Sequence, residues 1–127
     1  MLLRSGIDLV EIRRFEELSP SIRERFFRRV FTEQELAING ESLASLAGRF
    51  AVKEAVAKAL GCGIGPVGWK DIEVHRGPNG EPVLELHGPA QEAADRLGLT
   101  AWTVSISHTG GLAVASAVAI GMGERTG

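Results

Sequence analysis

Apolar residues recur along this chain at two spacings, one typical of helices and the other typical of strands. Ser, Thr or Pro begins most of the helical segments and Gly or Asn ends them, whereas β-branched and aliphatic runs mark the strands. Strands and helices segregate rather than alternate, which favours an α+β fold with a mainly antiparallel sheet and a long central helix. We expect helices over 11–18, 21–30, 32–39, 42 or 45 to 60, and 89–97, and strands over 3–8, 69–75, 82–87, 102–107 and 112–120.

Local sequence signals set several boundaries of these elements. Thr32, followed three residues later by Glu35, forms a capping box for the helix that begins there. Pro78-Asn79-Gly80 is a strong hairpin signal between the two middle strands. His-Thr-Gly-Gly at 108–111 joins the last two strands, so we expect His108 at the tip of a turn.

The long central helix is the most informative segment. Residues 49–60 contain eight apolar or alanine positions and four charges, and apolar groups occur on nearly every side, which predicts burial. Glu54 and Lys58 therefore project from an enclosed helix, where a charge is costly unless it is paired or bound to a metal. The simpler interpretation is a surface ion pair, since Glu and Lys four residues apart contribute about 0.2–0.5 kcal/mol on an exposed helix.

Composition narrows the class of protein. We expect one domain over 1–127, because the 44% apolar and 24% charged residues are ordinary for a globular chain of this length. The net charge of −2 does not suggest a nucleic-acid binder, and the apolar run over 112–120 is too short to span a bilayer. No signal peptide is recognisable, and the single cysteine, Cys62, excludes an internal disulfide, so we expect a cytoplasmic protein without membrane contact.

Positive charge is concentrated near the start of the chain. Seven of the 14 Lys and Arg residues lie in the first thirty positions, and all seven are arginines. A solvated helix surface is the ordinary explanation for such a cluster. The alternative is a docking surface for an acidic partner, since arginine makes bidentate contacts with carboxylates and phosphates.

Two carboxylates in apolar surroundings are candidates for a metal site. Asp8 lies within an otherwise apolar strand, where the ordinary reading is a strand-end residue that faces solvent. Together with Glu54 it would supply oxygen ligands for a hard cation such as Mg²⁺, which is commonly held by one or two carboxylates and substrate phosphates. The positive charge that a diphosphate substrate needs would come from Arg49, Lys53, Lys58 and His108.

The other candidate chemistries have weaker support. His108, with Ser107 and Thr109 beside it, forms a polar cluster suited to a phosphate, although a turn histidine is more often a local hydrogen-bonding residue. The glycine-rich segment 61–65 follows a helix and is weak evidence for a phosphate cradle. The chain has no Walker lysine, no Gly-x-Gly-x-x-Gly after a strand and no paired-histidine metal motif.

Taken in order, these residues resemble those of the holo-acyl-carrier-protein synthases, the short bacterial class of 4′-phosphopantetheinyl transferases. The match covers nearly the whole chain. Its most specific parts are 6–14 (GIDLVEIRR), 49–55 (RFAVKEA) with 58–61 (KALG), and 105–109 (SISHT). The resemblance implies transfer of the phosphopantetheine arm of coenzyme A to a serine of apo acyl carrier protein, with release of adenosine 3′,5′-bisphosphate.

The resemblance also implies roles for individual residues. Asp8 and Glu54 match the magnesium ligands that hold the diphosphate, and Lys58 matches a lysine that contacts the phosphates. Glu54, directly or through a metal-bound water, is the candidate acceptor of the serine proton. Arg49, His108 and Thr109 match residues around the nucleotide and its 3′-phosphate, with Gly61 and Ser107 completing the expected substrate-binding set. Arg14, Arg25 and Arg29 fall where the family meets the acidic helix of the carrier protein.

Two departures from the family pattern remove positive charge where the 3′-phosphate would lie. The segment 39–42 (NGES) replaces lysines or arginines, and Glu81 replaces a common lysine after the hairpin turn. The family also implies a homotrimer with active sites between subunits, and the apolar strand over 112–120 suits an interface. Two alternatives stay open: a non-catalytic coenzyme A or carrier-protein binding module, and a trimeric structural protein with surface ion pairs.

Overall fold

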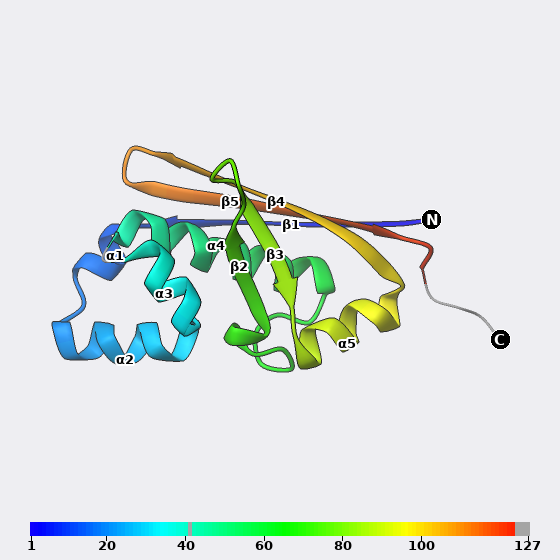
Figure 1. Ribbon diagram of the computed structural model, residues 1–127, viewed down its shortest axis with the longest axis horizontal. Coiled ribbons are helices and arrows are strands. Elements are labelled where there is room, and N and C mark those ends of the chain that lie inside the picture. Colours follow the sequence, from blue (N-terminus) through cyan, green and yellow to red (C-terminus); the bar gives the residue numbers. More distant parts are fainter. Residues whose placement is uncertain (41, 124–127) are drawn as a thin grey trace.

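The structure, a computed structural model, describes residues 1–40 and 42–123. The expected α+β fold with antiparallel strand pairing is confirmed (Figure 1). In chain order the elements are β1 (Leu2–Glu11), α1 (Arg13–Glu16), α2 (Pro20–Val30), α3 (Glu33–Asn39), α4 (Leu43–Leu60), the 3₁₀ helix η1 (Trp69–Asp71), β2 (Ile72–Arg76), β3 (Pro82–Leu86), α5 (Gly88–Leu97), β4 (Leu99–Thr109) and β5 (Leu112–Gly121).

Three long strands form one antiparallel sheet in the order β1-β5-β4, and β2 and β3 form a separate hairpin. Figure 1 shows the helices of the described chain together on one side of the long sheet. The hairpin lies between α3 and α5 on that same side. In the part of the chain that is described, no helix combines the length and the apolar character that crossing a bilayer requires.

Two strands are longer than the sequence pattern indicated. β1 continues past Asp8 because its last three residues pair with the start of β5, so the helix expected over 11–18 shrinks to α1. Asp8 lies inside the strand, opposite Ala115, and not at a strand end. β4 likewise runs on through His108, and the expectation of His108 at a turn tip is wrong. The turn is Gly110-Gly111, whose φ angles of 53° and 79° favour glycine.

Helix α4 packs closely on the inner face of the long sheet. Gly6 of β1 allows this approach, since a Cβ there would lie 1.9 Å from the backbone oxygen of Ala55. The inward residues of β5 are all alanines with 1% exposure or less, namely Ala113, Ala115, Ala117 and Ala119. Small side chains on both strands therefore let the helix backbone lie against the sheet.

The expected burial of α4 is confirmed for most of its length, since residues on several sides of the helix are buried. The enclosure expected for Glu54 and Lys58 is wrong, because Glu54 is only half-buried and Lys58 is exposed. Their carboxylate and ammonium groups border solvent along one side of α4. Both charges are therefore accessible to a ligand while their backbone is held rigidly.

Aromatic side chains hold the two short N-terminal helices against α4. The ring of Phe15 in α1 lies 5.7 Å from that of Phe26 in α2 and 5.5 Å from that of Phe50 in α4. Phe50 in turn stacks on Trp69 at 5.0 Å. Ring pairs at these separations add about 0.5–1.5 kcal/mol each beyond the area they bury. The exposed surfaces of α1 and α2 are thereby fixed next to each other.

Candidate active site

The structure brings Asp8, Glu54 and Lys58 together where β1 crosses α4. The ammonium of Lys58 lies 3.1 Å from Oδ1 of Asp8 and donates a hydrogen bond of 2.9 Å to the carbonyl of Ile7. Lys58 thus pairs with the strand rather than with Glu54 on its own helix. The side chain of Asp8 is 17% exposed and that of Lys58 is 52% exposed, so the cluster borders solvent.

The two carboxylates of this cluster affect one another electrostatically. Burial and the negative charge of Asp8 raise the pKa of Glu54, and Lys58 offsets this only in part. Such mutual repulsion is relieved when a cation lies between two carboxylates. Carboxylate oxygens are the ligands that Mg²⁺ prefers, so the donor set of Asp8 and Glu54 suits that ion.

His108 and Gly48 join the end of β4 to the beginning of α4. Nε2 of His108 lies 2.8 Å from the carbonyl oxygen of Ala44. A Cβ on Gly48 would lie 2.8 Å from the side chain of Ile106 and 3.3 Å from Nε2 of His108. The imidazole therefore rests against the helix where only glycine leaves room, on the same helix as Glu54.

Arg49 follows Gly48 on α4 and supplies buried positive charge. It is 6% exposed, and Nη1 lies 3.5 Å from Oγ of Ser45. Its Nε has no hydrogen-bond acceptor among the described residues. Burial and the positive charge of Arg76 in β2 both lower the pKa of Arg49. Two guanidinium groups and an unsatisfied donor make this a place where an anion would be stabilised.

Arg76 is a candidate that sequence reasoning missed. It ends β2 just before the predicted hairpin turn, and a basic residue at that point was the only available signal. Glu81, which was expected to weaken anion binding, is instead engaged in the turn, where Oε2 accepts a hydrogen bond of 3.1 Å from the backbone of Asn79. Glu41, the other departure, lies outside the described residues.

Ser107, His108 and Thr109 do not form the predicted cluster, because β4 directs their side chains to opposite faces of the sheet. Side chains alternate along β4, and His108 points toward α4. Ser107 and Thr109 pair with Val114 and Leu112 and are exposed on the opposite face of the sheet. Within one chain, these two hydroxyls are therefore not beside the imidazole.

Gly61 has a structural explanation of its own. It ends α4 in the left-handed conformation with φ 79°, which favours glycine. A Cβ there would lie 2.6 Å from the guanidinium of Arg4, whose Nε donates to the carbonyl of Ala59 at 2.9 Å. Gly61 lies close to Lys58, because its backbone N–H bonds the Lys58 carbonyl at 3.0 Å.

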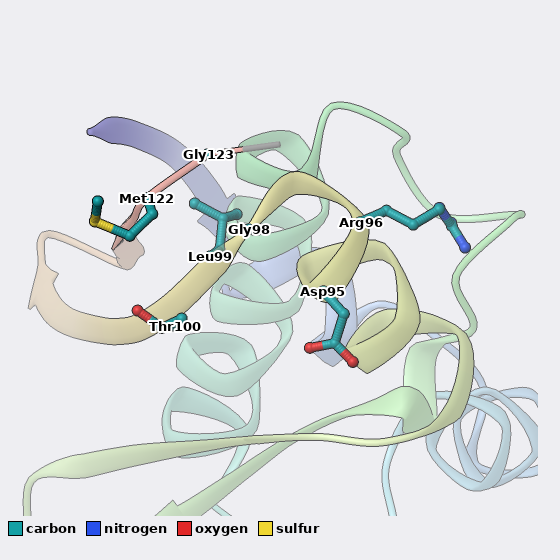
Figure 2. Close-up of a pocket in the computed structure, with 7 residues that line it drawn as sticks. All are labelled: Asp95, Arg96, Gly98, Leu99, Thr100, Met122 and Gly123. Atoms are coloured by element: carbon teal, nitrogen blue, oxygen red, sulfur yellow. The ribbon is translucent and has the colours of Figure 1, made fainter. Parts of the chain in front are cut away.

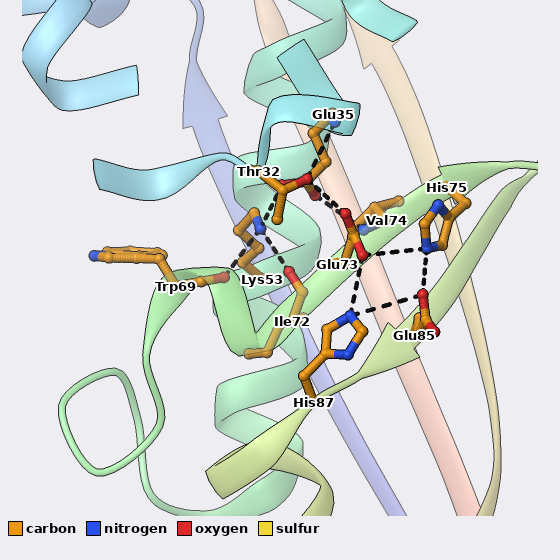
Figure 3. A network of polar contacts seen from close by, with 10 residues as sticks. All are labelled: Thr32, Glu35, Lys53, Trp69, Ile72, Glu73, Val74, His75, Glu85 and His87. Atoms are coloured by element: carbon orange, nitrogen blue, oxygen red, sulfur yellow. Dashed lines mark hydrogen bonds and ion pairs between the residues drawn. The ribbon is translucent and has the colours of Figure 1, made fainter. Parts of the chain in front are cut away.

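Lys53 was expected to help neutralise a diphosphate, and this is wrong. Its side chain is completely buried, and Nζ lies 2.8 Å from Oε1 of Glu35, 3.0 Å from the carbonyl of Trp69 and 2.5 Å from that of Ile72 (Figure 3). Burial lowers the pKa of Lys53, although Glu35 opposes the shift. Lys53 joins α4 to α3 and β2 and is not available to a ligand.

The seven N-terminal arginines fall into two groups. Four have hydrogen-bond or ion-pair partners within the chain: Arg4 with Ala59, Arg13 with Glu17, Arg23 with Glu16 and Leu18, and Arg28 with Glu24. Arg14, Arg25 and Arg29 are exposed, and none has a hydrogen-bond or ion-pair partner among the described residues. These are the three residues that the family resemblance assigned to an acidic partner.

Shallow depressions lie beside these three arginines on α1 and α2. One is lined by Arg14 with Val10, Phe15, Leu18, Phe26 and Phe50. The other is lined by Ile22, Arg25, Phe26 and Arg29. Phe26 is common to both, so apolar surface connects the three guanidinium groups.

A larger cavity than those beside the arginines lies elsewhere and contains none of the predicted residues. It has a volume of about 690 Å³ and is lined at the end of α5 by Asp95, Arg96, Gly98, Leu99, Thr100, Met122 and Gly123. Figure 2 shows its two charged side chains, Asp95 and Arg96, pointing in different directions. The chemistry at this cavity gives no reason to prefer it to the side of α4 that carries Glu54 and Lys58.

Known proteins resemble this chain in sequence and in structure. The sequence pattern of the 4′-phosphopantetheinyl transferase superfamily matches residues 4–115. A holo-[acyl-carrier-protein] synthase of Herpetosiphon aurantiacus is 44% identical over 127 residues, which cover 94% of this chain and 100% of that relative.

Solved structures extend the similarity to the fold. The holo-[acyl-carrier-protein] synthase of Helicobacter pylori in complex with coenzyme A gives a TM-score of 0.82 at 33% identity, with coverage of 91% of this chain and 99% of that one. The corresponding protein of Bacillus anthracis, in complex with CoA (3′,5′-ADP), gives a TM-score of 0.73 at 32% identity, with 96% of both chains covered.

Proposed function

Because the chain belongs to the 4′-phosphopantetheinyl transferase superfamily, we propose that it is a holo-[acyl-carrier-protein] synthase. The enzyme transfers the 4′-phosphopantetheine group of coenzyme A to a serine hydroxyl of apo acyl carrier protein. The serine oxygen bonds to the β-phosphorus, the diphosphate bridge breaks, and adenosine 3′,5′-bisphosphate leaves. The observation that carries this proposal is the meeting of Asp8, Glu54 and Lys58 on a side of α4 that borders solvent.

Charge neutralisation at the diphosphate is assigned to this cluster. Asp8 and Glu54 supply the carboxylate oxygens for Mg²⁺, and their mutual repulsion supports that role. When bound, Mg²⁺ offsets the negative charge of the diphosphate. The ammonium of Lys58 is exposed enough to reach a phosphate beside Asp8, and stabilises the charge that develops on the leaving group.

We assign a carboxylate oxygen of Glu54 as the acceptor of the proton that the attacking serine loses. Burial and the charge of Asp8 raise the pKa of Glu54, which makes it a better proton acceptor than an ordinary carboxylate. A cation on the same carboxylate lowers that basicity, so holding the metal and accepting the proton compete. A water near Glu54 is the alternative acceptor.

The nucleotide end of coenzyme A is assigned to the start of α4. Arg49 and Lys58 are nine residues, or about two and a half turns, apart on α4, so their side chains leave opposite sides of the helix. The two ends of one coenzyme A would therefore be held by these groups only if a second copy of the chain contributes to the site. The donors at the far end are Arg49, Arg76 and His108, and the unsatisfied Nε of Arg49 supports their role.

The acyl carrier protein is assigned to the surface of α1 and α2. Arg14, Arg25 and Arg29 have no partner among the described residues, and apolar surface around Phe26 connects them. Arginines in such an arrangement suit the carboxylates of an acidic helix. Local ion pairs occupy the neighbouring Arg13 and Arg28, which makes those two suitable control positions.

A homotrimer with active sites between subunits is proposed on the outer face of the long sheet. Leu3, Ile7 and Leu9 of β1 are 65%, 63% and 56% exposed, and Val118 and Ile120 of β5 are 36% and 40% exposed. An apolar sheet face of this kind marks an interaction surface. The exposed Ser107 and Thr109 lie on the same face, so a second copy would bring its hydroxyls to a shared site. The number three comes from the family resemblance.

Intact-mass spectrometry of apo carrier proteins tests the proposed reaction. Purified protein with Mg²⁺ and coenzyme A adds one phosphopantetheine group to at least one apo carrier in a panel of fatty-acid and polyketide carriers. Asp8→Ala, Glu54→Ala and Lys58→Ala each lower the transfer rate at least about a hundredfold. The control Glu92→Ala, at an exposed position of α5, leaves the rate unchanged.

Failure to modify any carrier, together with coenzyme A binding that does not respond to Mg²⁺, would favour a non-catalytic binding module. Transfer that survives simultaneous replacement of Glu54 and Lys58 would favour the structural-protein alternative. A cytoplasmic location, expected from the single cysteine, remains a prediction that fractionation of the source cells tests.

A further inference from the structure

Two of the three histidines of the chain lie on the β2–β3 hairpin, each beside a glutamate. Glu73 and His75 are two residues apart in β2, and Glu85 and His87 are two residues apart at the end of β3. Side chains two apart on a strand share a face, and Glu73 pairs directly with Glu85 across the hairpin. The four side chains therefore converge on one face of the hairpin, as Figure 3 shows.

The donor atoms of this cluster form a closed ring. Nε2 of His75 lies 2.6 Å from Oε1 of Glu85 and 3.4 Å from Oε1 of Glu73. Nε2 of His87 lies 3.0 Å from that same oxygen of Glu73 and 3.6 Å from that of Glu85. The donor atoms of Glu73, Glu85 and His87 all lie within 4.8 Å of one another.

The glutamate–histidine separations lie near those of a zinc site. With metal–ligand distances of 2.0–2.2 Å, neighbouring donors around a tetrahedral Zn²⁺ lie about 3.3–3.5 Å apart. The four glutamate–histidine separations lie on both sides of this value. The donors of Glu73, Glu85 and His87 form the mutually close set, and His75 reaches that set through its contacts with both glutamates.

Charge also favours a dication over simple ion pairs. Two carboxylates directly opposite each other on paired strands repel, and Glu73 is only 7% exposed, which limits its screening by water. One dication between the two carboxylates would offset the charge of both, and neutral imidazole is the form of histidine that binds metals.

An outer hydrogen bond orients the central ligand. Oγ1 of Thr32, which caps α3, donates to Oε2 of Glu73 at 2.6 Å and leaves Oε1 directed at the two imidazoles. The backbone N–H of His87 is fixed by the carbonyl of Asp71 at 2.8 Å. Partners of this kind typically change metal affinity by about 10–100-fold. The site is therefore preorganised by α3 and η1.

We propose that Glu73, His75, Glu85 and His87 form a binding site for a transition-metal dication of the zinc type, separate from the carboxylate pair Asp8 and Glu54. Mixed imidazole and carboxylate donors suit Zn²⁺ and Co²⁺, whereas Mg²⁺ prefers oxygen ligands. The bound ion ties the two strands of the hairpin together, and Glu73 ties them to α3. The role of this site is structural, and binding of the ion raises the stability of the hairpin.

Metal titration of the untagged, chelator-treated protein tests this site, with Mg²⁺ present in excess to occupy oxygen-only sites. Zn²⁺ is followed by calorimetry and Co²⁺ by its visible absorption. The expected result is one saturable site per chain, a tetrahedral Co²⁺ spectrum and a higher melting temperature with Zn²⁺. His75→Ala and His87→Ala each weaken the affinity at least about tenfold.

Two matched controls separate this site from other positions. His108→Ala removes the third histidine, which lies outside the cluster, and Glu54→Gln alters the other carboxylate pair, so both keep the affinity of the original chain. The proposal is overturned if Zn²⁺ shows no saturable binding, if binding survives both hairpin histidine substitutions, or if it is lost in Glu54→Gln instead. An octahedral Co²⁺ spectrum would also contradict it.

Discussion

At the scale of single residues, the chemistry of the proposed enzyme depends on the surroundings of Glu54. The carboxyl group of Glu54 is half-buried and is repelled by Asp8, and the positive charge of Lys58 offsets this repulsion only in part. Its pKa is therefore raised above the ordinary 4.5, so the folded state binds this proton more tightly than the unfolded chain. The associated stability is present at low pH and is lost as the pH rises through the raised pKa of the folded state.

Glu54→Gln separates stability from activity. The amide keeps the size of the side chain but removes the repulsion from Asp8, so the metal-free variant melts a few degrees higher than the original chain at neutral pH. The difference shrinks toward pH 4, where the carboxyl of the original chain is protonated. Transfer activity falls at least about a hundredfold. Thermal melts across pH check this, and a lower melting temperature at neutral pH would contradict it.

At the scale of elements, α4 carries the site because two contacts fix its position. Lys53 bonds Glu35 of α3 and two carbonyls of the η1–β2 segment, and the Lys53 and Glu35 side chains have no contact with solvent. The side chains of Ile106 and His108, near the end of β4, pack against Gly48. The first contact sets the helix relative to the hairpin and the second relative to the sheet.

Lys53→Met destabilises the protein by about 3–5 kcal/mol, because it leaves Glu35 buried without its charged partner. The pair of changes Lys53→Met and Glu35→Gln recovers part of this loss. Urea denaturation measures both. A variant with unchanged stability but greatly weakened coenzyme A binding would instead support a direct phosphate contact by Lys53.

Gly48→Ala tests the contact between β4 and α4. Helix propensity favours alanine by about 1 kcal/mol, but the Cβ would lie 2.8 Å from Ile106, and overpacking costs about 1–3 kcal/mol. We expect net destabilisation and a raised KM for coenzyme A, since His108 is displaced. Ala44→Gly is the control, because it changes the helix propensity of α4, in the opposite direction, without adding atoms beside the imidazole. A net gain in stability for Gly48→Ala would show that the contact is looser than described.

At the scale of the whole molecule, the uncovered face of the long sheet decides the assembly. Ile7→Glu places a charge at the centre of the exposed apolar strand, so we expect the proposed trimer to dissociate and transfer to be lost. Light scattering after size-exclusion chromatography measures the mass. Ile22→Glu, at an exposed position of α2 away from the sheet, leaves the mass of the assembly unchanged. A monomeric original chain would contradict the interface.

Signals that act within a few residues predicted much of this molecule. The capping box of Thr32 and Glu35, the glycine at the end of α4 and the turn at Pro78-Asn79-Gly80 all appear as expected. The lengths of β1 and β4 were underestimated because they depend on a distant partner: β1 continues past Asp8 only because β5 pairs with it. The strand expected over 69–75 was placed too early, since residues 69–71 form the 3₁₀ helix η1 and β2 begins at Ile72.

Burial and register explain the remaining differences. Lys53 looks like an accessible basic residue until α3 places Glu35 against it. The cluster on the hairpin escaped sequence analysis because helical spacing defines the familiar histidine motif, whereas here strand pairing brings the ligands together. The repeated Glu-x-His on either side of the hairpin turn was the available signal. Asp8 and Glu54, although far apart in the chain, were paired as carboxylates in apolar surroundings, and the family resemblance assigned the same pair to magnesium.

The proposed mechanism depends on Asp8 and Glu54 acting as ligands of one magnesium ion beside the diphosphate. Calorimetric titration of Mg²⁺ into the protein saturated with coenzyme A measures this, with Asp8→Asn, Glu54→Gln and the double variant compared. We expect either single change to remove nearly all of the Mg²⁺ affinity and the double change to add little, because both groups hold the same ion. Undiminished Mg²⁺ binding in both single variants, or losses that add as they do for independent sites, would rule out a shared ion.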